Sequence, residues 1–344
     1  MNPLVSDVVD LASDDIALAD RMNAGRQQIL NELRKIIVGQ QEVIDQALLT
    51  LFVGGNSLIV GAPGLAKTLL IHTMARVLDL KFSRIQFTPD LMPSDITGTD
   101  LVQEDTTTGK RQMVFAPGPI FANIVLADEI NRTPPKTQSA LLEAMQEHRV
   151  TIQGRTYQLT EPFYVFATQN PIELEGTYPL PEAQLDRFMF HIVIDHPPYD
   201  EELGVVRQTT AIQNPQIEKP ITGEDLVRFQ QLVRRVPVAE PVMRHALDIV
   251  RASRPKSDNS PDNVKRWVAF GGSVRAAQYL ILGGKARALT NGRYHVSFED
   301  VRALAHPVLR HRIITNFHAQ SEGITSDTLV DRLLDAVPLP RSGM

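Results

Sequence analysis

The chain has 344 residues, a length that allows two or three domains and a sizeable hydrophobic core. With 43% hydrophobic and 22% charged residues, its composition is that of an ordinary globular protein. The net charge of −5 argues against a nucleic-acid-binding protein, and the absence of cysteine excludes disulfide bonds, thiolate metal sites and thiol nucleophiles.

The N-terminal residues 1–20 are acidic and poor in aromatic side chains, so we expect a mobile or loosely helical arm there. This stretch lacks the basic and apolar regions of a signal peptide. No apolar run approaches the roughly 18 residues that a membrane-spanning helix needs. We therefore expect a cytoplasmic protein without a membrane span. The nine histidines show no metal-ligand spacing, which predicts structural or surface roles.

Helical and strand-like patterns alternate over residues 21–197. Apolar residues at helical spacing predict helices over about 19–37 and 40–52, and later over 68–78 and 135–147. Short apolar runs predict strands at Leu58–Val60, Phe82–Phe87, Ile124–Ala127, Phe163–Ala167 and Phe188–Ile194. Such alternation favours an α/β fold with a mostly parallel sheet that is covered on both faces.

Two insertions interrupt this pattern. Residues 88–121 contain many turn residues and few helix signals, and 149–160 have the pattern of a β-hairpin with a turn at Gln153-Gly154-Arg155. After about residue 197 only helical patterns remain. We therefore predict a second, smaller, all-helical domain over 198–330, followed by a C-terminal tail over 331–344.

A glycine loop follows the first predicted strand and precedes a predicted helix. It comprises Gly61-Ala62-Pro63-Gly64-Leu65-Ala66-Lys67-Thr68 and leads into Leu69. Backbone N–H groups of such a loop cradle triphosphate oxygens, a lysine reaches the β- and γ-phosphates, and a threonine hydroxyl binds Mg²⁺. The common pattern has glycine where this chain has Ala66. An ordinary turn with a solvated Lys67 is the competing interpretation.

The third predicted strand, Ile124-Val125-Leu126-Ala127, is uniformly apolar. Two acids follow it directly, Asp128 and Glu129. Asp128 suits a role beside Mg²⁺, and Glu129 suits a role in polarising an attacking water. The alternative is that both acids merely open the next helix, where negative charge is favourable. Because a phosphate-binding loop lies upstream, we favour the site.

Three further residues are candidates for the same chemistry. Asn170 follows a buried strand and would orient the attacking water, although Asn-Pro is also a common turn. Arg187 would reach a neighbour's nucleotide, and its alternative is an ion pair with Asp186 or Glu182. Arg275 follows two glycines and would contact the γ-phosphate. The alternative interpretation is that Ser273 caps a helix and Arg275 lies on its surface.

Over about residues 34–320 the chain resembles AAA+ ATPases, and within them the MoxR family. The resemblance rests on the glycine loop, on the segments 85–98 and 128–132, and on Leu180-Pro181-Glu182-Ala183-Gln184-Leu185-Asp186-Arg187-Phe188. Segment 85–98 best distinguishes the MoxR family from other AAA+ ATPases, because general ATPases lack it. The family pattern also carries alanine at position 66. The resemblance implies an αβα sandwich with a parallel five-stranded sheet, followed by a helical lid.

The resemblance also implies residue roles. Lys67 and Thr68 match the Walker A motif, Asp128 and Glu129 match Walker B, and Thr68 and Asp128 would bind Mg²⁺. Asn170, Arg187 and Arg275 match sensor 1, the arginine finger and sensor 2, although Val274 stands where relatives often have proline. Segment Val38-Gly39-Gln40 matches the position against adenine. The insertions 88–121 and 149–160 resemble the helix-2 insert and the pre-sensor-1 hairpin.

The family implies an ATP-hydrolysing motor that forms hexameric rings with nucleotide between subunits. It would remodel or mature partner complexes, often with a von Willebrand factor A-domain protein, and its lid would close over the nucleotide. Arg132 is a further residue that would face a neighbour, whereas we expect Arg302, Arg310 and Arg312 on solvated helix faces or in ion pairs within the lid. Three other functions remain possible for the chain. It could be the ATPase subunit of a metal chelatase, a DNA translocase that contacts DNA with the hairpin 149–160, or a nucleotide-gated scaffold that binds ATP with little turnover.

Overall fold

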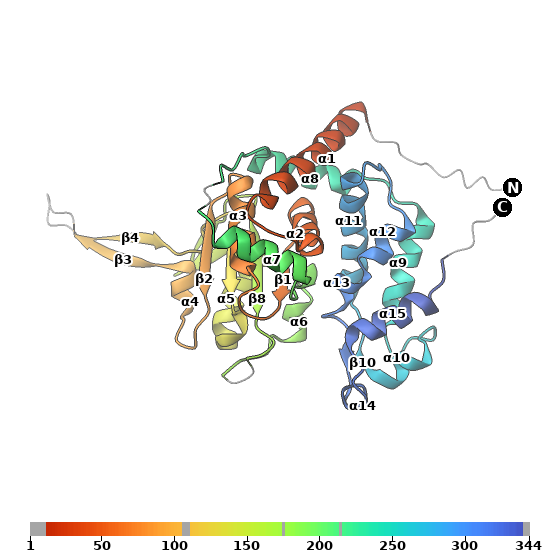
Figure 1. Ribbon diagram of the computed structural model, residues 1–344. Helices are drawn as coiled ribbons and strands as arrows, with labels where there is room; N and C mark the ends of the chain where they lie inside the picture. Colours follow the sequence, from red (N-terminus) through yellow and green to blue (C-terminus); the bar gives the residue numbers. More distant parts are fainter. Residues whose placement is uncertain (1–11, 105–110, 174–175, 213–214, 340–344) are drawn as a thin grey trace.

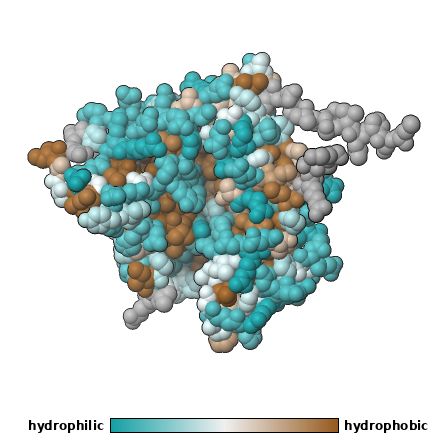
Figure 2. All heavy atoms as spheres, turned by 45° about the vertical axis from the view of Figure 1, so that its right-hand side comes forward, coloured by the Kyte–Doolittle hydropathy of each residue, from teal (hydrophilic) through white to brown (hydrophobic). Residues whose placement is uncertain are grey.

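The computed structural model describes residues 12–104, 111–173, 176–212 and 215–339. A larger part is built on a β-sheet, and a smaller, mostly helical part lies beside it (Figure 1). The face of the molecule shown in Figure 2 is mostly hydrophilic, with scattered groups of apolar residues. Within the described residues, no helix has the length and apolar character needed to span a membrane.

The central sheet has five strands in the order β2-β5-β8-β1-β9, and every neighbouring pair is parallel. The strands are β1 (Ser57–Val60), β2 (Phe82–Gln86), β5 (Ile124–Asp128), β8 (Tyr164–Gln169) and β9 (Phe190–Val193). β5 is buried along its whole length, as expected for a parallel strand covered on both faces. The predicted parallel five-stranded sheet is confirmed.

Alternate residues of β5 enter two separate hydrophobic clusters. Ile124 and Leu126 pack with the helices on one face, whereas Val125 and Ala127 pack on the other. The first face is covered by α1 (Ser13–Arg34), α2 (Gln41–Val53) and α3 (Lys67–Val77), and the second by α4 (Pro93–Thr97) and α5 (Pro135–Glu147). This arrangement is the predicted αβα sandwich.

The N-terminal arm that we predicted over 1–20 is too long. Helix α1 begins at Ser13, Ala19 is buried, and Asp15 forms a 2.7 Å ion pair with Arg235. The acids that suggested a mobile arm instead lie in the first turn of a helix, where the helix dipole favours negative charge. Residues 1–11 lie outside the described residues.

The first insertion contains strands that the sequence did not predict. β3 (Gly98–Glu104) and β4 (Arg111–Pro117) form an antiparallel ribbon that projects from the body (Figure 1). The second insertion is a hairpin of β6 (Arg149–Ile152) and β7 (Arg155–Gln158). An aromatic stack joins the two, because the rings of Phe115 and Tyr157 lie 4.2 Å apart between centroids.

The remaining elements follow β8. α6 (Glu182–Leu185) precedes β9, and α7 (Tyr199–Thr209) and α8 (Gly223–Arg235) follow it. Helix α8 packs on α2 through an edge-on contact between Phe52 and Phe229. The remaining helices of the lid, which we predicted over 198–330, are α9 (Glu240–Ala252), α10 (Asp262–Trp267), α11 (Val274–Thr290), α12 (Phe298–Ala303), α13 (Ala305–Leu309), α14 (Phe317–Ser321) and α15 (Ser326–Ala336).

Two details of the lid differ from the prediction. A short antiparallel ribbon of β10 (Val268–Phe270) and β11 (Ile314–Thr315) accompanies the helices. Helix α15 also runs into the predicted tail 331–344, because Leu329, Val330 and Leu333 follow one another at helical spacing and are buried. Residues 340–344 lie outside the described part of the chain.

Two histidines lie where the lid meets the sheet. The rings of His191, on β9, and His311, in the lid, are 5.9 Å apart. Burial, aided by the charge of Arg310, lowers the pKa of His191 to about 4. Burial, aided by Arg312 and His191, lowers the pKa of His311 well below its ordinary value. Both rings are therefore neutral in the folded protein at neutral pH.

We expect this pair to make folding sensitive to acid. Since both folded-state pKa values lie below the unfolded value of about 6.5, the unfolded chain binds more protons between about pH 6.5 and 4. The free energy of unfolding should fall as the pH drops through this window, by at most ~1.4 kcal/mol per pH unit for each histidine. Urea titrations at several pH values should show a flatter dependence for His191→Gln. If the free energy of unfolding of His191→Gln depends on pH as steeply as that of the unaltered protein, His191 does not cause the acid sensitivity.

The control for this experiment is His306, whose shift has the opposite sign. Hydrogen bonding to Asp327, aided by Asp331, raises its pKa. Its contribution to the free energy of unfolding is therefore complete below about pH 6.5 and is lost as the pH rises through the raised pKa. His306→Gln should change stability at neutral pH but leave the slope between about pH 6.5 and 4 unaltered.

Candidate active site

The glycine loop joins β1 to α3, as the sequence predicted. Gly64 has φ 86° and Ala66 has φ 58°, and helix α3 begins at Lys67. Ala66 therefore carries its Cβ in the left-handed region, where glycine is normally favoured. The missing glycine does not mean that the loop avoids this conformation, because the chain adopts it with an alanine.

Ala66→Gly is expected to stabilise the protein slightly. Removing a Cβ from a left-handed residue relieves strain of about 1–2 kcal/mol, partly offset by the greater freedom of glycine in the unfolded chain. We expect a gain of up to about 1 kcal/mol in urea unfolding. Ala62→Gly is the matched control, because Ala62 does not have a positive φ, and it should lose stability. A loss at Ala66 as large as that at Ala62 would contradict the argument.

Lys67, the first residue of α3, is turned back onto its own loop. Its Nζ donates hydrogen bonds to the carbonyl oxygens of Gly61, at 2.6 Å, and Ala62, at 2.8 Å. Burial lowers the pKa of Lys67, and the charges of Asp128 and Glu129 oppose this shift. The ammonium group thus lies in the field of both acids.

Asp128, at the end of β5, is held from two sides. The Thr168 hydroxyl donates to its Oδ1 at 2.5 Å, and the Arg84 guanidinium donates to its Oδ2 at 2.9 and 2.6 Å. Arg84 comes from β2 and Thr168 from β8, the two neighbours of β5 in the sheet. The carboxylate is mostly buried, so its direction is fixed by these partners.

Glu129 follows directly in a left-handed conformation, with φ 55°. Its backbone N–H donates to the Thr168 hydroxyl at 2.9 Å. Its carboxylate accepts a hydrogen bond from Gln86 Nε2 at 2.9 Å and lies 3.1 Å from Arg132 Nη1. Arg132 is therefore turned toward a carboxylate of its own subunit, whereas we had considered it as a residue that faces a neighbour.

These groups line one cleft of about 430 Å³. The predicted residues Lys67, Thr68, Asp128, Glu129 and Asn170 all lie on it, together with loop residues 63–66 and Leu69. Asn170 also forms the competing turn, because its Oδ1 accepts a hydrogen bond from the Ile172 N–H at 3.1 Å.

The sequence did not single out three other residues of the cleft. Arg84, Thr168 and Gln169 line it together with the predicted set. The sequence did contain a signal for Arg84. This exposed arginine precedes the buried Ile85 on β2, the strand that leads into segment 85–98. Its partner Asp128 could be found only from the pairing of β2 with β5.

The predicted adenine segment lies close to the start of the glycine loop. Gln40 Nε2 donates to the Asp195 carbonyl at 2.9 Å, just beyond β9. A Cβ placed on Gly61 would lie 2.3 Å from the carbonyl oxygen of Ile194, so the loop and the end of β9 are in close contact. Gly39 has φ 66°, and Glu201 of α7 lies against it. Val38 packs near Gly204 of the same helix.

Arg187 and Arg275 do not line this cleft. Arg187 Nη1 donates to the carbonyl of Leu142, in the middle of α5, at 3.2 Å. Arg275 Nη1 lies 3.0 Å from Asp186 Oδ2. Asp186 pairs with the lid arginines Arg275 and Arg312, and no ion pair of Arg187 with Asp186 or Glu182 occurs in the described residues.

The donor set fits Mg²⁺ bound together with a nucleotide. Thr68 and Asp128 supply a hydroxyl and a carboxylate, and Mg²⁺ is usually held by one or two protein oxygens, substrate phosphates and water. Among the described residues, no group of three or more histidines and acids is placed to hold a metal alone. A Mg²⁺ ion at Thr68 and Asp128 would take the rest of its ligands from substrate phosphates and water.

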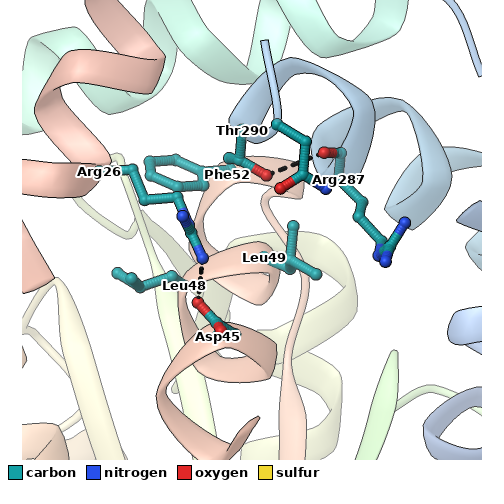
Figure 3. Close-up of a pocket in the computed structure, with 8 residues that line it drawn as sticks. Arg26, Asp45, Leu48, Leu49, Phe52, Arg287 and Thr290 are labelled. Atoms are coloured by element: carbon teal, nitrogen blue, oxygen red, sulfur yellow. Dashed lines mark hydrogen bonds and ion pairs between the residues drawn. The ribbon is translucent and has the colours of Figure 1, made fainter. Parts of the chain in front are cut away.

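A smaller cavity of about 140 Å³ lies between α1, α2 and α11 (Figure 3). Its Arg26 is ion-paired with Asp45, and Thr290 hydrogen-bonds the carbonyl oxygen of Arg287. Neither the glycine loop nor the acidic end of β5 lines this cavity, whereas both line the larger cleft.

Comparison with known proteins gives the same result as the geometry. Residues 56–190 match the model of the ATPase family associated with various cellular activities, and residues 260–333 match an AAA lid domain. The chain is 42% identical to Chaperone MoxR1 of Mycobacterium tuberculosis over 92% of its own length and 82% of that protein's. It is 28% identical to Protein MoxR of Paracoccus denitrificans, over 90% of this chain and 94% of that one.

A solved structure agrees over nearly the whole chain. The crystal structure of a candidate ATPase from Cytophaga hutchinsonii superposes with a TM-score of 0.87 and 39% identity, covering 94% of this chain and 98% of that one. The sheet order, the cleft and these relatives have one explanation. The chain belongs to the MoxR family of AAA+ ATPases.

Proposed function

We propose that the chain hydrolyses ATP to ADP and phosphate in the cleft between the glycine loop and the acidic end of β5. The observation that carries this proposal is that Lys67, Thr68, Asp128, Glu129 and Asn170 converge on one cleft from separate elements. Phosphate binding needs the first two residues, and hydrolysis needs a base near the attacking water.

Each residue has a distinct task in this proposal. The Lys67 ammonium exchanges its loop carbonyls for phosphate oxygens, which are stronger acceptors. Glu129 takes the proton of the attacking water, and Asn170 orients that water. Thr68 and Asp128 would hold Mg²⁺, which when bound neutralises phosphate charge. Val38, Gly39 and Gln40 would lie beside the adenine.

We further propose that the active site is completed by a second copy of the chain, in a hexameric ring, which a measurement of the mass of the assembled protein in solution would test. Arg187 lies away from its own cleft, which is the placement that action on a neighbour's nucleotide requires. Arg275 also lies outside the cleft, bound to Asp186, and it would reach its own nucleotide only after the lid moves.

We propose that ATP turnover drives the remodelling of a partner protein complex. A relative named as a chaperone supports this role, and the projecting β3–β4 ribbon offers a contact surface, with a von Willebrand factor A-domain protein as an expected partner. Glu129→Gln loaded with ATP should retain a partner in affinity capture, whereas Lys67→Ala should not. Equal capture by both variants, or by ADP-loaded protein, would contradict an ATP-dependent grip.

A further inference from the structure

The backbone of the short segment 186–189, which carries Arg187, forms hydrogen bonds with two parts of the molecule. Its N–H groups bond to the sheet domain: Arg187 N–H to Gln184, Phe188 N–H to Leu185 and Met189 N–H to Asn56, at 3.1, 3.0 and 2.6 Å. Its carbonyl groups face the lid. The segment thus lies at the junction between the lid and the sheet domain.

Four consecutive carbonyl oxygens of this segment, from Asp186 to Met189, accept hydrogen bonds from the lid. Arg312 donates to those of Asp186, Phe188 and Met189, at 2.7, 2.6 and 3.3 Å. The Tyr279 hydroxyl donates to the carbonyl of Arg187 itself, at 3.1 Å. His311 Nε2 also lies 3.1 Å from the Phe188 carbonyl oxygen.

Arg312 uses every N–H group of its guanidinium. Besides the three carbonyls of the segment, its Nε donates to Asp186 Oδ1 at 2.8 Å and its Nη1 to the Val308 carbonyl at 2.5 Å. The side chain is 2% exposed, and its guanidinium lies over the Tyr279 ring at 5.2 Å. We had expected Arg312 on a solvated face or in an ion pair within the lid, but it is buried and binds the sheet domain.

This geometry requires arginine. A planar guanidinium supplies five donors in fixed directions, whereas a lysine ammonium supplies three from a single point. A buried charge with this many partners is costly to leave half satisfied, so the lid and the segment are held in one relative position. The Arg187 side chain itself takes no part and remains turned toward α5.

We propose that Arg312 and Tyr279 are positioning residues for Arg187, so that the lid of one copy sets the arginine presented to the next copy's nucleotide. This inference rests on the proposed action of Arg187 on a neighbour. Any lid rotation on nucleotide binding is transmitted to the turn 186–189 through these hydrogen bonds. A misplacement of about 1 Å in a catalytic group can cost roughly 10²-fold in rate.

Mixed assemblies test this proposal. Lys67→Ala subunits cannot hydrolyse ATP but can offer Arg187, and Arg187→Ala subunits have an intact cleft, so mixing them should restore phosphate release. Adding Arg312→Lys to the Lys67→Ala subunit should reduce the rescue by roughly 10²-fold. Adding it to the Arg187→Ala subunit should leave the rescue within about twofold, because that subunit presents no Arg187 and Arg312 does not line its cleft.

Tyr279→Phe provides a milder variant that preserves the packing of the ring. It removes one hydrogen bond to the Arg187 carbonyl and should lower the rescue about fivefold, again only in the Lys67→Ala subunit. Arg310→Lys is the matched control, since Arg310 also links lid and sheet, through the His191 carbonyl, but does not touch the segment. It should not affect the rescue from either subunit.

The outcomes separate the two proposals. Equal loss from Arg312→Lys in either subunit, together with no effect of Tyr279→Phe, would show a general structural role and overturn the positioning role. Full rescue with Arg312→Lys beside Lys67→Ala would also overturn it. No rescue between Lys67→Ala and Arg187→Ala alone would instead refute the shared active site, and the positioning role with it.

Discussion

Glu129→Gln is expected to abolish ATP turnover while ATP binding is kept. The glutamine side chain has the same shape, and its oxygen can still accept the hydrogen bonds from Gln86 and Arg132. It cannot accept a proton from water, so the loss of general-base catalysis should lower kcat by roughly 10²–10⁴-fold. Phosphate release and ATP binding, measured on the same preparation, check the two parts of this prediction.

Glu173→Gln is the matched control for this variant. Glu173 lies 3.7 Å from the same Arg132 but does not line the cleft. Its removal should leave kcat within about twofold, since surface ion pairs contribute little. If Glu129→Gln hydrolyses ATP at the rate of the unaltered protein, then Glu129 does not activate the water.

Arg187→Ala should have a second large effect, on turnover and not on nucleotide affinity. The guanidinium lies outside its own cleft, so the dissociation constant of ATP should stay nearly constant in the isolated subunit. Removal of a transition-state cation should lower kcat by roughly 10³-fold in the assembled protein. Steady-state kinetics and equilibrium binding separate these two quantities.

Arg244→Ala is a suitable control, because Arg244 is 73% exposed and pairs only with Glu240 of the same helix among the ion pairs of the described residues. It should not change kcat. A normal kcat for Arg187→Ala would exclude a catalytic role for this arginine. A large loss of ATP affinity in the same variant would point to damage in its own subunit.

The cleft could be predicted well from sequence because its signals are local. The apolar strand, glycine loop and helix occupy one continuous stretch, and β5 is so uniformly apolar that its two terminal acids stand out. The order of such elements fixes a parallel sheet with both sets of residues at the same edge. The structure brings Lys67, Asp128 and Asn170 together as expected.

The contacts that join distant parts of the chain could not be predicted in this way. Arg84 and Asp128 are 44 residues apart, and Arg312 and Asp186 are 126 apart. Nothing in the local pattern of an arginine distinguishes a buried guanidinium with five partners from a solvated one. Pairing of two strands in the first case, and docking of the lid in the second, creates the site for each charge.

The central claim is that this chain hydrolyses ATP in the cleft lined by Lys67 and Glu129. Phosphate release from ATP by the purified protein, measured with and without Mg²⁺ beside Lys67→Ala, tests it most directly. We predict Mg²⁺-dependent release by the unaltered protein and none above background by Lys67→Ala. Release by Lys67→Ala at the unaltered rate, or no release by any assembled form of the unaltered protein, would contradict the claim.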